Sequence, residues 1–247
     1  MQPQPSPDVT DLPWYRAIFT QQMFICVLTG LASGLPLYFL IQLVPAWLRS
    51  EGVGLTEIGL FALVGFPYNW KFVWAPLMDR YVPPFLGRRR GWMLITQIAL
   101  MLSMAALGFI DPTMSVGLVA YVAAGVAFFS ASQDVVLDAY RRELLKDEEL
   151  GLGNAIHVQA YRLAGLVPGS LGVIMGDYFP WSTVFMVMAG FMLIGVAMTF
   201  WVSEAGDDSA APLTLRAAVV EPFNEFVQRN GLGSALWLLT FLFLYKL

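Results

Sequence analysis

The chain has 247 residues, of which 57% are hydrophobic and 13% are charged, and its formal net charge is −4. Its mean hydropathy is +0.64. A soluble domain of this length has about a quarter charged residues, so the composition excludes an ordinary soluble protein and indicates an all-α, polytopic membrane protein. Cys26 is the only cysteine, which excludes disulfides and thiolate metal sites.

The first predicted span, at about 19–47, follows a polar, proline-rich tail of residues 1–18. Near the middle of this span, Gly30 and Gly34 have the spacing that permits close helix packing. Pro36 frees a backbone carbonyl, which predicts a kink. A packing notch with a kink is one interpretation of this segment, and a broken helix that lines a cavity is the other.

The second span is predicted at about 55–78 and contains a lysine at membrane depth. Lys71 lies nine residues before Arg80, so at ~1.5 Å per residue it is roughly 13 Å from the membrane surface. From there its side chain scarcely reaches water, and we expect it to face a cavity. A basic segment follows, which we interpret as a topology determinant and, with Arg141, as a cytoplasmic loop or gate; its residues are Asp79, Arg80, Arg88, Arg89 and Arg90.

Four further spans are predicted at about 92–110, 114–140, 152–175 and 181–202. Residues 203–230 then form a hydrophilic connector. Within it, Pro222 can start a short helix on the membrane surface, with Phe223, Phe226 and Val227 on one face.

A seventh apolar run, 231–247, is barely long enough to cross a membrane, so we expect a longer chain whose seventh span only begins here. The first six spans form two groups of three, which predicts a bundle of two inverted three-span repeats. The loops on the side of the tail contain ten basic residues, whereas the opposite loops contain only Arg49. This asymmetry predicts that the tail and the connector face the cytoplasm.

The fourth span ends in SASQDVVLDAYRR, which places Gln133, Asp134 and Asp138 at membrane depth. A carboxylate inside a hydrophobic segment costs roughly 2.5–3.5 kcal/mol on insertion scales, so it usually has a function. The two aspartates are four residues apart and share one helix face. That face must contact a protein interior or an aqueous cavity, which is typical of a transport site.

Two interpretations of these polar residues remain open. In the first, Asp134 and Arg162 form a fixed structural ion pair, and Asp138 pairs with Arg141 or Arg80 at the inner surface. In the second, Asp134, and with it Asp138, exchanges a proton during a transport cycle, because burial and a nearby cation act on an aspartate pKa in opposite directions. A polar, anionic solute would then contact Lys71, Gln133 and Arg162.

The remaining polar residues favour neither catalysis nor cofactor binding. His157 is the only histidine, and we expect it to be a hydrogen-bonded packing residue. The sequence has no Gly-rich phosphate loop, no HExxH motif and no GxSxG motif, so we expect no enzyme, no metal and no cofactor. Nucleic-acid binding is not expected either, because the basic residues lie in loops between spans.

Four segments resemble the AmpG-type muropeptide permeases, a branch of the major facilitator superfamily: ASGLP (32–36), LVGFPYNWKFVWAPLMDRYVPPFLGRRRGW (63–92), SASQDVVLDA (130–139) and YRL (161–163). The resemblance extends from the first span into the seventh. In the general superfamily pattern the basic triplet follows Asp-Arg after a couple of residues, whereas here YVPPFL intervenes, as it does in the permease branch. Members of the family also have a second six-span half.

This resemblance implies the major facilitator fold and a proton-driven importer in the bacterial inner membrane, with a muropeptide, protons and the lipid bilayer as its partners. The solute would be GlcNAc-anhydro-MurNAc, with or without peptide, taken up for peptidoglycan recycling and, indirectly, β-lactamase induction. We expect Tyr68 and Trp70 to join Lys71, Gln133 and Arg162 around the solute, and we expect a monomer. The alternatives are a symporter for another anionic or acylated solute and a non-transporting half-length fragment.

Overall fold

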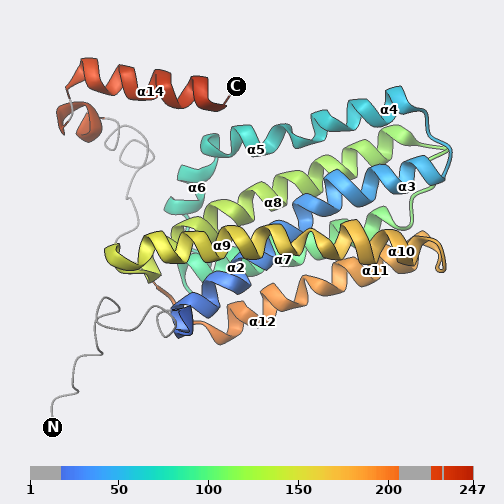
Figure 1. Ribbon diagram of the computed structural model, residues 1–247, viewed down its shortest axis with the longest axis horizontal. Helices are drawn as coiled ribbons and strands as arrows, with labels where there is room; N and C mark the ends of the chain where they lie inside the picture. The colour runs from blue at the N-terminus through green and yellow to red at the C-terminus, as the bar shows by residue number, and fades with distance from the viewer. Residues whose placement is uncertain (1–17, 206–223, 230, 247) are drawn as a thin grey trace, which may run out of the picture.

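A computed structural model describes residues 18–205, 224–229 and 231–246, and these residues form helices and loops without a β-strand. Six segments, which we call spans one to six, lie side by side along the long axis of the molecule (Figure 1). Span one comprises α2 (Gln21–Tyr38), the π-helix η2 (Phe39–Leu43) and α3 (Val44–Ser50). Span two comprises α4 (Leu55–Leu60), η3 (Phe61–Gly65), α5 (Phe66–Trp70), η4 (Lys71–Val73) and α6 (Ala75–Arg80).

Span three is α7 (Arg88–Leu107), and span four is α8 (Val116–Leu144). The short 3₁₀-helix η5 (Asp147–Glu149) connects span four to span five. Span five comprises α9 (Leu150–Ala164), the π-helix η6 (Val167–Gly172) and α10 (Val173–Gly176). Span six comprises α11 (Trp181–Phe191) and α12 (Leu193–Trp201).

Spans one, three, four and six are the four described helical segments that are long and apolar enough to cross a membrane. Spans two and five are interrupted by 3₁₀ and π-helical turns. In span two, Pro67 and Pro76 each stand in the first turn of a new helical segment, where a missing N–H costs little. In span five, Pro168 stands at the start of the π-helix. Proline therefore stands at three of the places where the helical geometry changes, whereas η3 and η4 contain none.

The main packing contacts relate the first three spans to the next three. In two three-span repeats, spans one, two and three correspond to spans four, five and six. Span one packs against span five, and the corresponding spans four and two also pack against each other. Likewise, span one packs against span six, and span four packs against span three. Spans one and four also contact each other, as do spans three and six. This pattern is the one expected for two three-span repeats with spans one and four at the centre, and the predicted all-α bundle is confirmed.

The glycine pair of span one packs closely against span five. A Cβ atom added at Gly30 would lie 2.8 Å from the Ala160 Cβ atom, and one added at Gly34 would lie 3.0 Å from the Ala164 Cβ atom. The predicted packing notch is therefore confirmed. Pro36 is buried within α2, and a π-helical turn follows it without breaking the span.

Aromatic side chains fix span one against span six. Phe39 and Trp47 of span one meet the ring of Phe185 edge to face, with centroids 5.1 and 4.9 Å apart. All three rings are buried in the largest apolar cluster. Aromatic pairs in this geometry contribute roughly 0.5–1.5 kcal/mol beyond the burial of their area.

The two ends of the bundle differ in charge. The left end in Figure 1, where α7 begins and α8 ends, carries the arginines 88–90 and 141–142, and we call it the basic end. At the opposite end, the connection between α7 and α8 is closed by Asp111, whose carboxylate accepts a hydrogen bond from the Thr113 N–H at 2.9 Å.

Span three begins earlier than predicted. We expected a loop up to residue 91 and a span from residue 92, but α7 starts at Arg88, so the three arginines form its first turn. Gly87 precedes the helix with a φ of 84°, a conformation that favours glycine.

Beyond residue 205 the structure describes a short helix at 224–229 and α14 (Leu232–Lys246). Phe226 and Val227 are half-buried in the short helix, whereas Pro222 and Phe223 lie outside the described residues. α14, red in Figure 1, lies outside the six-span bundle.

Candidate functional site

The two aspartates of span four face both span one and span two. Asp134 Oδ1 accepts a hydrogen bond from the Ser33 hydroxyl of span one at 2.5 Å. Asp134 Oδ2 lies 3.9 Å from the Lys71 ammonium of span two. The same ammonium lies 3.9 Å from Asp138 Oδ2, so one cation stands between the two carboxylates. A single side chain, Asp134, thus contacts two neighbouring spans through its two oxygens.

Lys71 reaches this position where span two changes its helical geometry. α5 ends at Trp70, and the 3₁₀-helix η4 begins at Lys71. The side chain of Asp134 is 13% exposed, that of Lys71 is 34% exposed and that of Asp138 is 52% exposed. The three charges therefore form a path from a buried carboxylate to an accessible one, with the lysine between them.

Asp138 also makes the ion pair that the first interpretation assigned to it. Its Oδ1 accepts a hydrogen bond from Arg141 Nη2 at 2.9 Å. The same guanidinium nitrogen lies 3.4 Å from Asn154 Oδ1 of span five. Asp138 thus connects span two with the contact between spans four and five.

Arg162 does not form the fixed pair with Asp134 that the first of the two interpretations contained. It lines a separate polar pocket of about 510 Å³ between spans one and five. No carboxylate of a described residue lies within ion-pair distance of its guanidinium. The structure therefore lacks the ion pair of the first interpretation, because equal depth does not determine direction around a helix axis. Ser33 and Lys71 contact the two oxygens of Asp134 instead.

Gln133 is fully buried against span one, and its Nε2 donates a hydrogen bond to the Ala32 carbonyl at 2.9 Å. Within the described part of the chain, its Oε1 has no hydrogen-bond partner. The structure thus places Gln133 in the packing contact between spans one and four, beside Asp134 but away from solvent.

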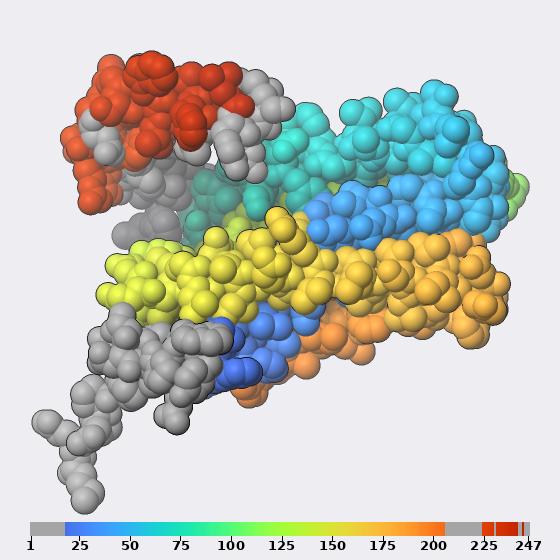
Figure 2. All heavy atoms as spheres, viewed as in Figure 1, coloured from blue at the N-terminus to red at the C-terminus, as the bar shows by residue number. Residues whose placement is uncertain are grey.

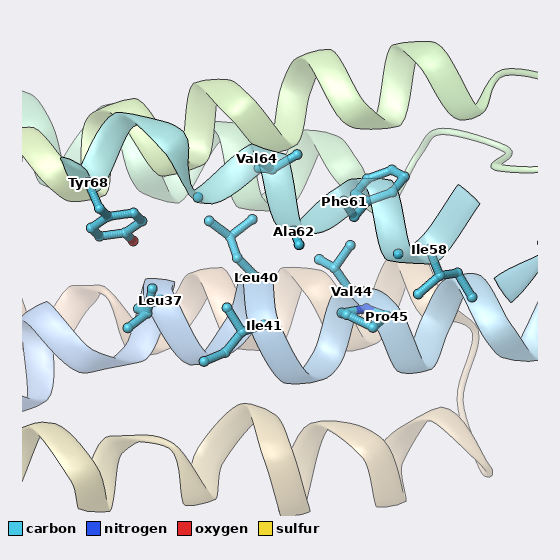
Figure 3. Close-up of a pocket in the computed structure, with 12 residues that line it drawn as sticks. Leu37, Leu40, Ile41, Val44, Pro45, Ile58, Phe61, Ala62, Val64 and Tyr68 are labelled. Atoms are coloured by element: carbon cyan, nitrogen blue, oxygen red, sulfur yellow. The ribbon is translucent and has the colours of Figure 1, made fainter. Parts of the chain in front are cut away.

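The two predicted aromatic residues of span two lie in different surroundings. Tyr68 lines an apolar cavity of about 240 Å³ between spans one and two, opposite Leu37, Leu40 and Ile41 (Figure 3). Trp70 is 48% exposed and stacks between other rings, with its centroid 5.5 Å from that of Phe66 and 6.0 Å from that of Phe72. Tyr68 therefore lines a cavity, whereas Trp70 is largely exposed.

A second charged cluster lies at the basic end. Arg89 forms an ion pair with Asp79 of span two at 2.5 Å and with Glu143 of span four at 2.5 Å. Arg88 approaches the same Glu143 at 3.3 Å. Both arginines are almost completely buried. Arg89 thus joins the ends of spans two, three and four, and it is more than an exposed topology signal.

Glu204, just beyond span six, caps the start of span three. Its carboxylate accepts hydrogen bonds from the backbone N–H groups of Arg89 at 2.7 Å and Arg90 at 3.1 Å. Acidic groups stabilise helix N-termini, which otherwise disfavour a first turn made of arginines. Arg90 also donates to the Thr199 carbonyl at 2.9 Å. Arg80 differs from the triplet, because its described contact is the face of the Tyr81 ring, 5.4 Å from the centroid.

His157 has the structural role that was predicted for it. The ring is buried, and its Nδ1 lies 3.1 Å from the Thr29 hydroxyl, so it joins spans one and five by a hydrogen bond.

The sequence analysis missed Ser33, Glu143 and Glu204. Ser33 lies between Gly30 and Gly34, which were interpreted as packing residues. The Ser33 hydroxyl, which donates to Asp134, was therefore not considered as part of a polar site. Glu143 lies beyond the predicted end of the fourth span at about residue 140, and no role was predicted for it. Buried arginines require acidic partners near them, and this requirement could have identified it. Glu204 had no local signal, because it contacts residues 115 positions earlier in the chain.

Comparison with known proteins gives consistent results. The chain matches the Major Facilitator Superfamily over residues 27–246. It is 43% identical over 236 residues to the anhydromuropeptide permease of Escherichia coli (strain K12), which covers 94% of this chain and 47% of that protein.

Two further relatives support the same assignment. The identity is 48% to an uncharacterized protein of Haemophilus influenzae, over 93% of this chain and 54% of that protein. It is 31% to the putative transporter AmpG 3 of Rickettsia prowazekii, over 89% of this chain and 55% of that protein. The chain thus spans about half the length of the curated relatives it matches.

Proposed function

Because the chain belongs to the major facilitator superfamily, we propose that it acts in secondary active transport, as a proton-coupled importer of anhydromuropeptides. The name of the E. coli relative supplies the solute class, and the similarity to it covers nearly all of this chain. The solute would be GlcNAc-anhydro-MurNAc, with or without peptide, imported for peptidoglycan recycling. An importer of this kind needs no catalytic group, and the charged residues of the site would serve binding and coupling.

In this proposal, residues 19–202 form a six-span transport bundle in the bacterial inner membrane. The basic end faces the cytoplasm, because ten of the basic residues fall on that side of the spans in the sequence and only Arg49 falls on the opposite side. Residues 203–230 form a cytoplasmic connector, and residues 231–247 begin a seventh span. The protein functions as a monomer with a small-molecule solute, protons and the bilayer as its partners.

The observation that carries the proposal is the position of Lys71 between Asp134 and Asp138. With both carboxylates ionised, one ammonium attracts both, and span two is drawn to span four. When a proton binds Asp134, that attraction disappears and Lys71 keeps only the more accessible Asp138 as its partner. The protonated acid also becomes a donor, so its hydrogen bond with Ser33 changes character. Proton binding thereby alters the contacts of span four with spans one and two together.

The test is uptake of labelled GlcNAc-anhydro-MurNAc by membrane vesicles that contain the native protein, with and without an imposed pH gradient. The parent is expected to accumulate the sugar only with the gradient, and Asp134→Asn is expected to lose this accumulation. Asp147→Asn is the matched control, because Asp147 pairs with Arg142 on the exposed surface at 3.0 Å. Gradient-dependent accumulation by Asp134→Asn at the parental rate would contradict the proposed role of Asp134 in coupling. A correctly inserted parent that takes up none of the sugar would contradict the proposed solute.

A further inference from the structure

A second polar site lies between spans one and five, apart from the Lys71 site. It is the pocket of about 510 Å³ that contains Arg162, and the residues that matter for its chemistry are Tyr38, Gln42, Arg162, Gly165, Gly169 and Ser170. In Figure 2, span five (yellow) and span two (cyan to teal) flank span one (blue). Span one forms one wall of this pocket and span five forms the other.

Both walls of the pocket contain a π-helical segment. Gln42 lies in η2 of span one, and Gly169 and Ser170 lie in η6 of span five. The two π-helical segments pack against each other. π-Helical turns are rare, and those that occur are often found at functional sites. Two such turns in contact with each other are even less expected from packing alone.

Two glycines of span five allow side chains of span one to lie against its backbone. A Cβ atom added at Gly165 would lie 2.9 Å from Cγ of the Tyr38 ring. One added at Gly169 would overlap the Gln42 amide, whose Cδ would be 2.9 Å away. The ring and the amide therefore occupy their positions because span five has no side chain there, and the space beside them is polar.

Among the described residues, Arg162 is a cation without a carboxylate partner, and its side chain is exposed. Its guanidinium stays protonated in proteins, so the pocket keeps a positive charge. Charged side chains within membrane spans usually pair with an opposite charge. Lys71 has two carboxylates at 3.9 Å, whereas no described carboxylate lies within ion-pair distance of Arg162. The missing anion is therefore best supplied by a ligand.

We propose that this pocket is a subsite that binds a carboxylate of the transported solute together with an adjacent hydroxyl or amide group. The Arg162 guanidinium binds the carboxylate through two parallel N–H donors. Gln42 and Ser170 form hydrogen bonds with the neighbouring polar group, and the Tyr38 ring offers a flat apolar surface. The inference rests on the proposed function for the identity of the solute, but it concerns a different cation from the one that carries proton coupling.

The experiment measures equilibrium binding of two probes to the native protein in nanodiscs. The probes are GlcNAc-anhydro-MurNAc, which has a free lactyl carboxylate, and the methyl ester of the same compound. The parent should bind the acid at least about tenfold more tightly than the ester, as expected for a charge-assisted bidentate contact. Arg162→Gln should bind both probes with the affinity that the parent has for the ester.

Further variants separate the other contacts. Gln42→Leu should weaken binding of both probes about tenfold while the ratio of acid to ester affinity stays near that of the parent. Gly169→Ala should reproduce Gln42→Leu, because its methyl group displaces the Gln42 amide. Arg142→Gln removes an exposed cation that is paired with Asp147, and it should bind like the parent.

The inference is overturned if the parent does not distinguish acid from ester, or if Arg162→Gln keeps the parental ratio. Where Arg162→Gln does not fold, Arg162→Lys serves instead, because lysine keeps the charge but lacks the two parallel N–H donors of the guanidinium. If Arg162→Lys had the same ratio of acid to ester affinity as the parent, the inference would again be overturned. Uptake is measured in parallel. Binding with the expected preference but without gradient-driven uptake would contradict the proposed transport function and leave the subsite standing.

Discussion

The Ser33 hydroxyl donates a hydrogen bond to Asp134 at 2.5 Å, and it does so from the face of span one next to the packing glycines. Gly30 and Gly34 bring the same helix against span five. Span one therefore holds Asp134 with one face and packs closely against span five with another. A change at Asp134 would be transmitted to span one directly.

Replacing Ser33 should impair the site without changing its charges. Ser33→Ala leaves Asp134 Oδ1 without its donor, and a hydrogen bond to a charged group contributes about 1.5–3 kcal/mol. We expect uptake of GlcNAc-anhydro-MurNAc to fall about tenfold or more. Ser103→Ala is the control, because the Ser103 hydroxyl donates only to carbonyls of its own helix, at 2.7 and 3.1 Å. Equal uptake by the two variants would show that the hydrogen bond to Asp134 has no part in the cycle.

A double-mutant cycle should reveal coupling between Lys71 and Asp134. Lys71→Gln leaves two carboxylates facing each other, and Asp134→Asn leaves Lys71 with one partner. The double variant removes the charges of Lys71 and Asp134 together. Its loss of stability should therefore be smaller, by about 0.5–3 kcal/mol, than the sum of the losses in the two single variants. Thermal unfolding in detergent measures this difference.

The control cycle uses Arg142→Gln and Asp147→Asn, which remove an ion pair whose side chains are 63% and 78% exposed. Exposed pairs contribute about 0–1 kcal/mol, so the surface cycle should give a coupling energy near zero. Similar coupling energies in both cycles would indicate that the Lys71–Asp134 contact is no stronger than a surface ion pair.

Arg89 and Arg80 belong to the same basic segment, yet their substitution should have very different effects. Arg89 is 7% exposed and pairs with Asp79 and Glu143, whose side chains are 39% and 25% exposed, so Arg89→Gln leaves two partly exposed carboxylates without this cation. Breaking a fully buried pair costs about 3–5 kcal/mol, and the cost here should be smaller because water reaches both carboxylates and Arg88 still approaches Glu143. Arg80→Gln should cost under about 1 kcal/mol, since the described contact of Arg80 is a ring face. The yield of folded protein after detergent extraction would distinguish the two variants. Equal yields would refute the role of Arg89 in joining the ends of spans two, three and four.

Glu204 should stabilise span three through its cap. Glu204→Ala removes the acceptor for two backbone N–H groups, and loss of a helix cap costs about 0.5–2 kcal/mol. Glu204→Gln keeps an acceptor oxygen and should lose less. Glu148→Ala is the control at an exposed acidic residue. The melting temperature should decrease in the order control, glutamine and alanine, and a glutamine variant as unstable as the alanine variant would mean that the charge alone matters.

The sequence predicted the types of residue in the site better than their partners. Depth along a helix follows from residue counting, so Lys71, Asp134 and Asp138 could be placed near one another before the fold was known. The direction of each side chain around its helix axis depends on how the spans pack, and this decided that Lys71 and Ser33, not Arg162, meet Asp134.

The basic end shows a second limit of sequence analysis. An arginine triplet beside a span satisfies the positive-inside rule whether it is exposed or buried. Its burial depends on Glu143 from span four and Glu204 from beyond span six, which only the folded bundle brings together. In contrast, the notch of Gly30 and Gly34 was predictable, because small residues four positions apart suffice for close packing in any partner context.

Replacing glycine by alanine should change the stability in opposite directions at two positions, one of which is in the glycine notch. Glycine within a helix is about 1 kcal/mol less favourable than alanine, so an unhindered replacement should stabilise the protein. Gly125 of span four has nothing within 4 Å of an added Cβ atom, and Gly125→Ala should raise the unfolding temperature slightly. At Gly34 the added methyl group would meet the Ala164 Cβ atom at 3.0 Å and the backbone of span five, which cannot move away as a flexible side chain can.

Gly34→Ala should therefore lower the unfolding temperature, with a cost of about 1–3 kcal/mol for an overpacked interface. Because the same helix holds Asp134 through Ser33, the variant should also lose uptake, whereas Gly125→Ala should not. Gly34→Ala with raised stability would mean that spans one and five separate readily, and the close contact would then not fix the position of Asp134. Lowered stability with unchanged uptake would show instead that the packing of span one against span five and the chemistry at Asp134 are independent.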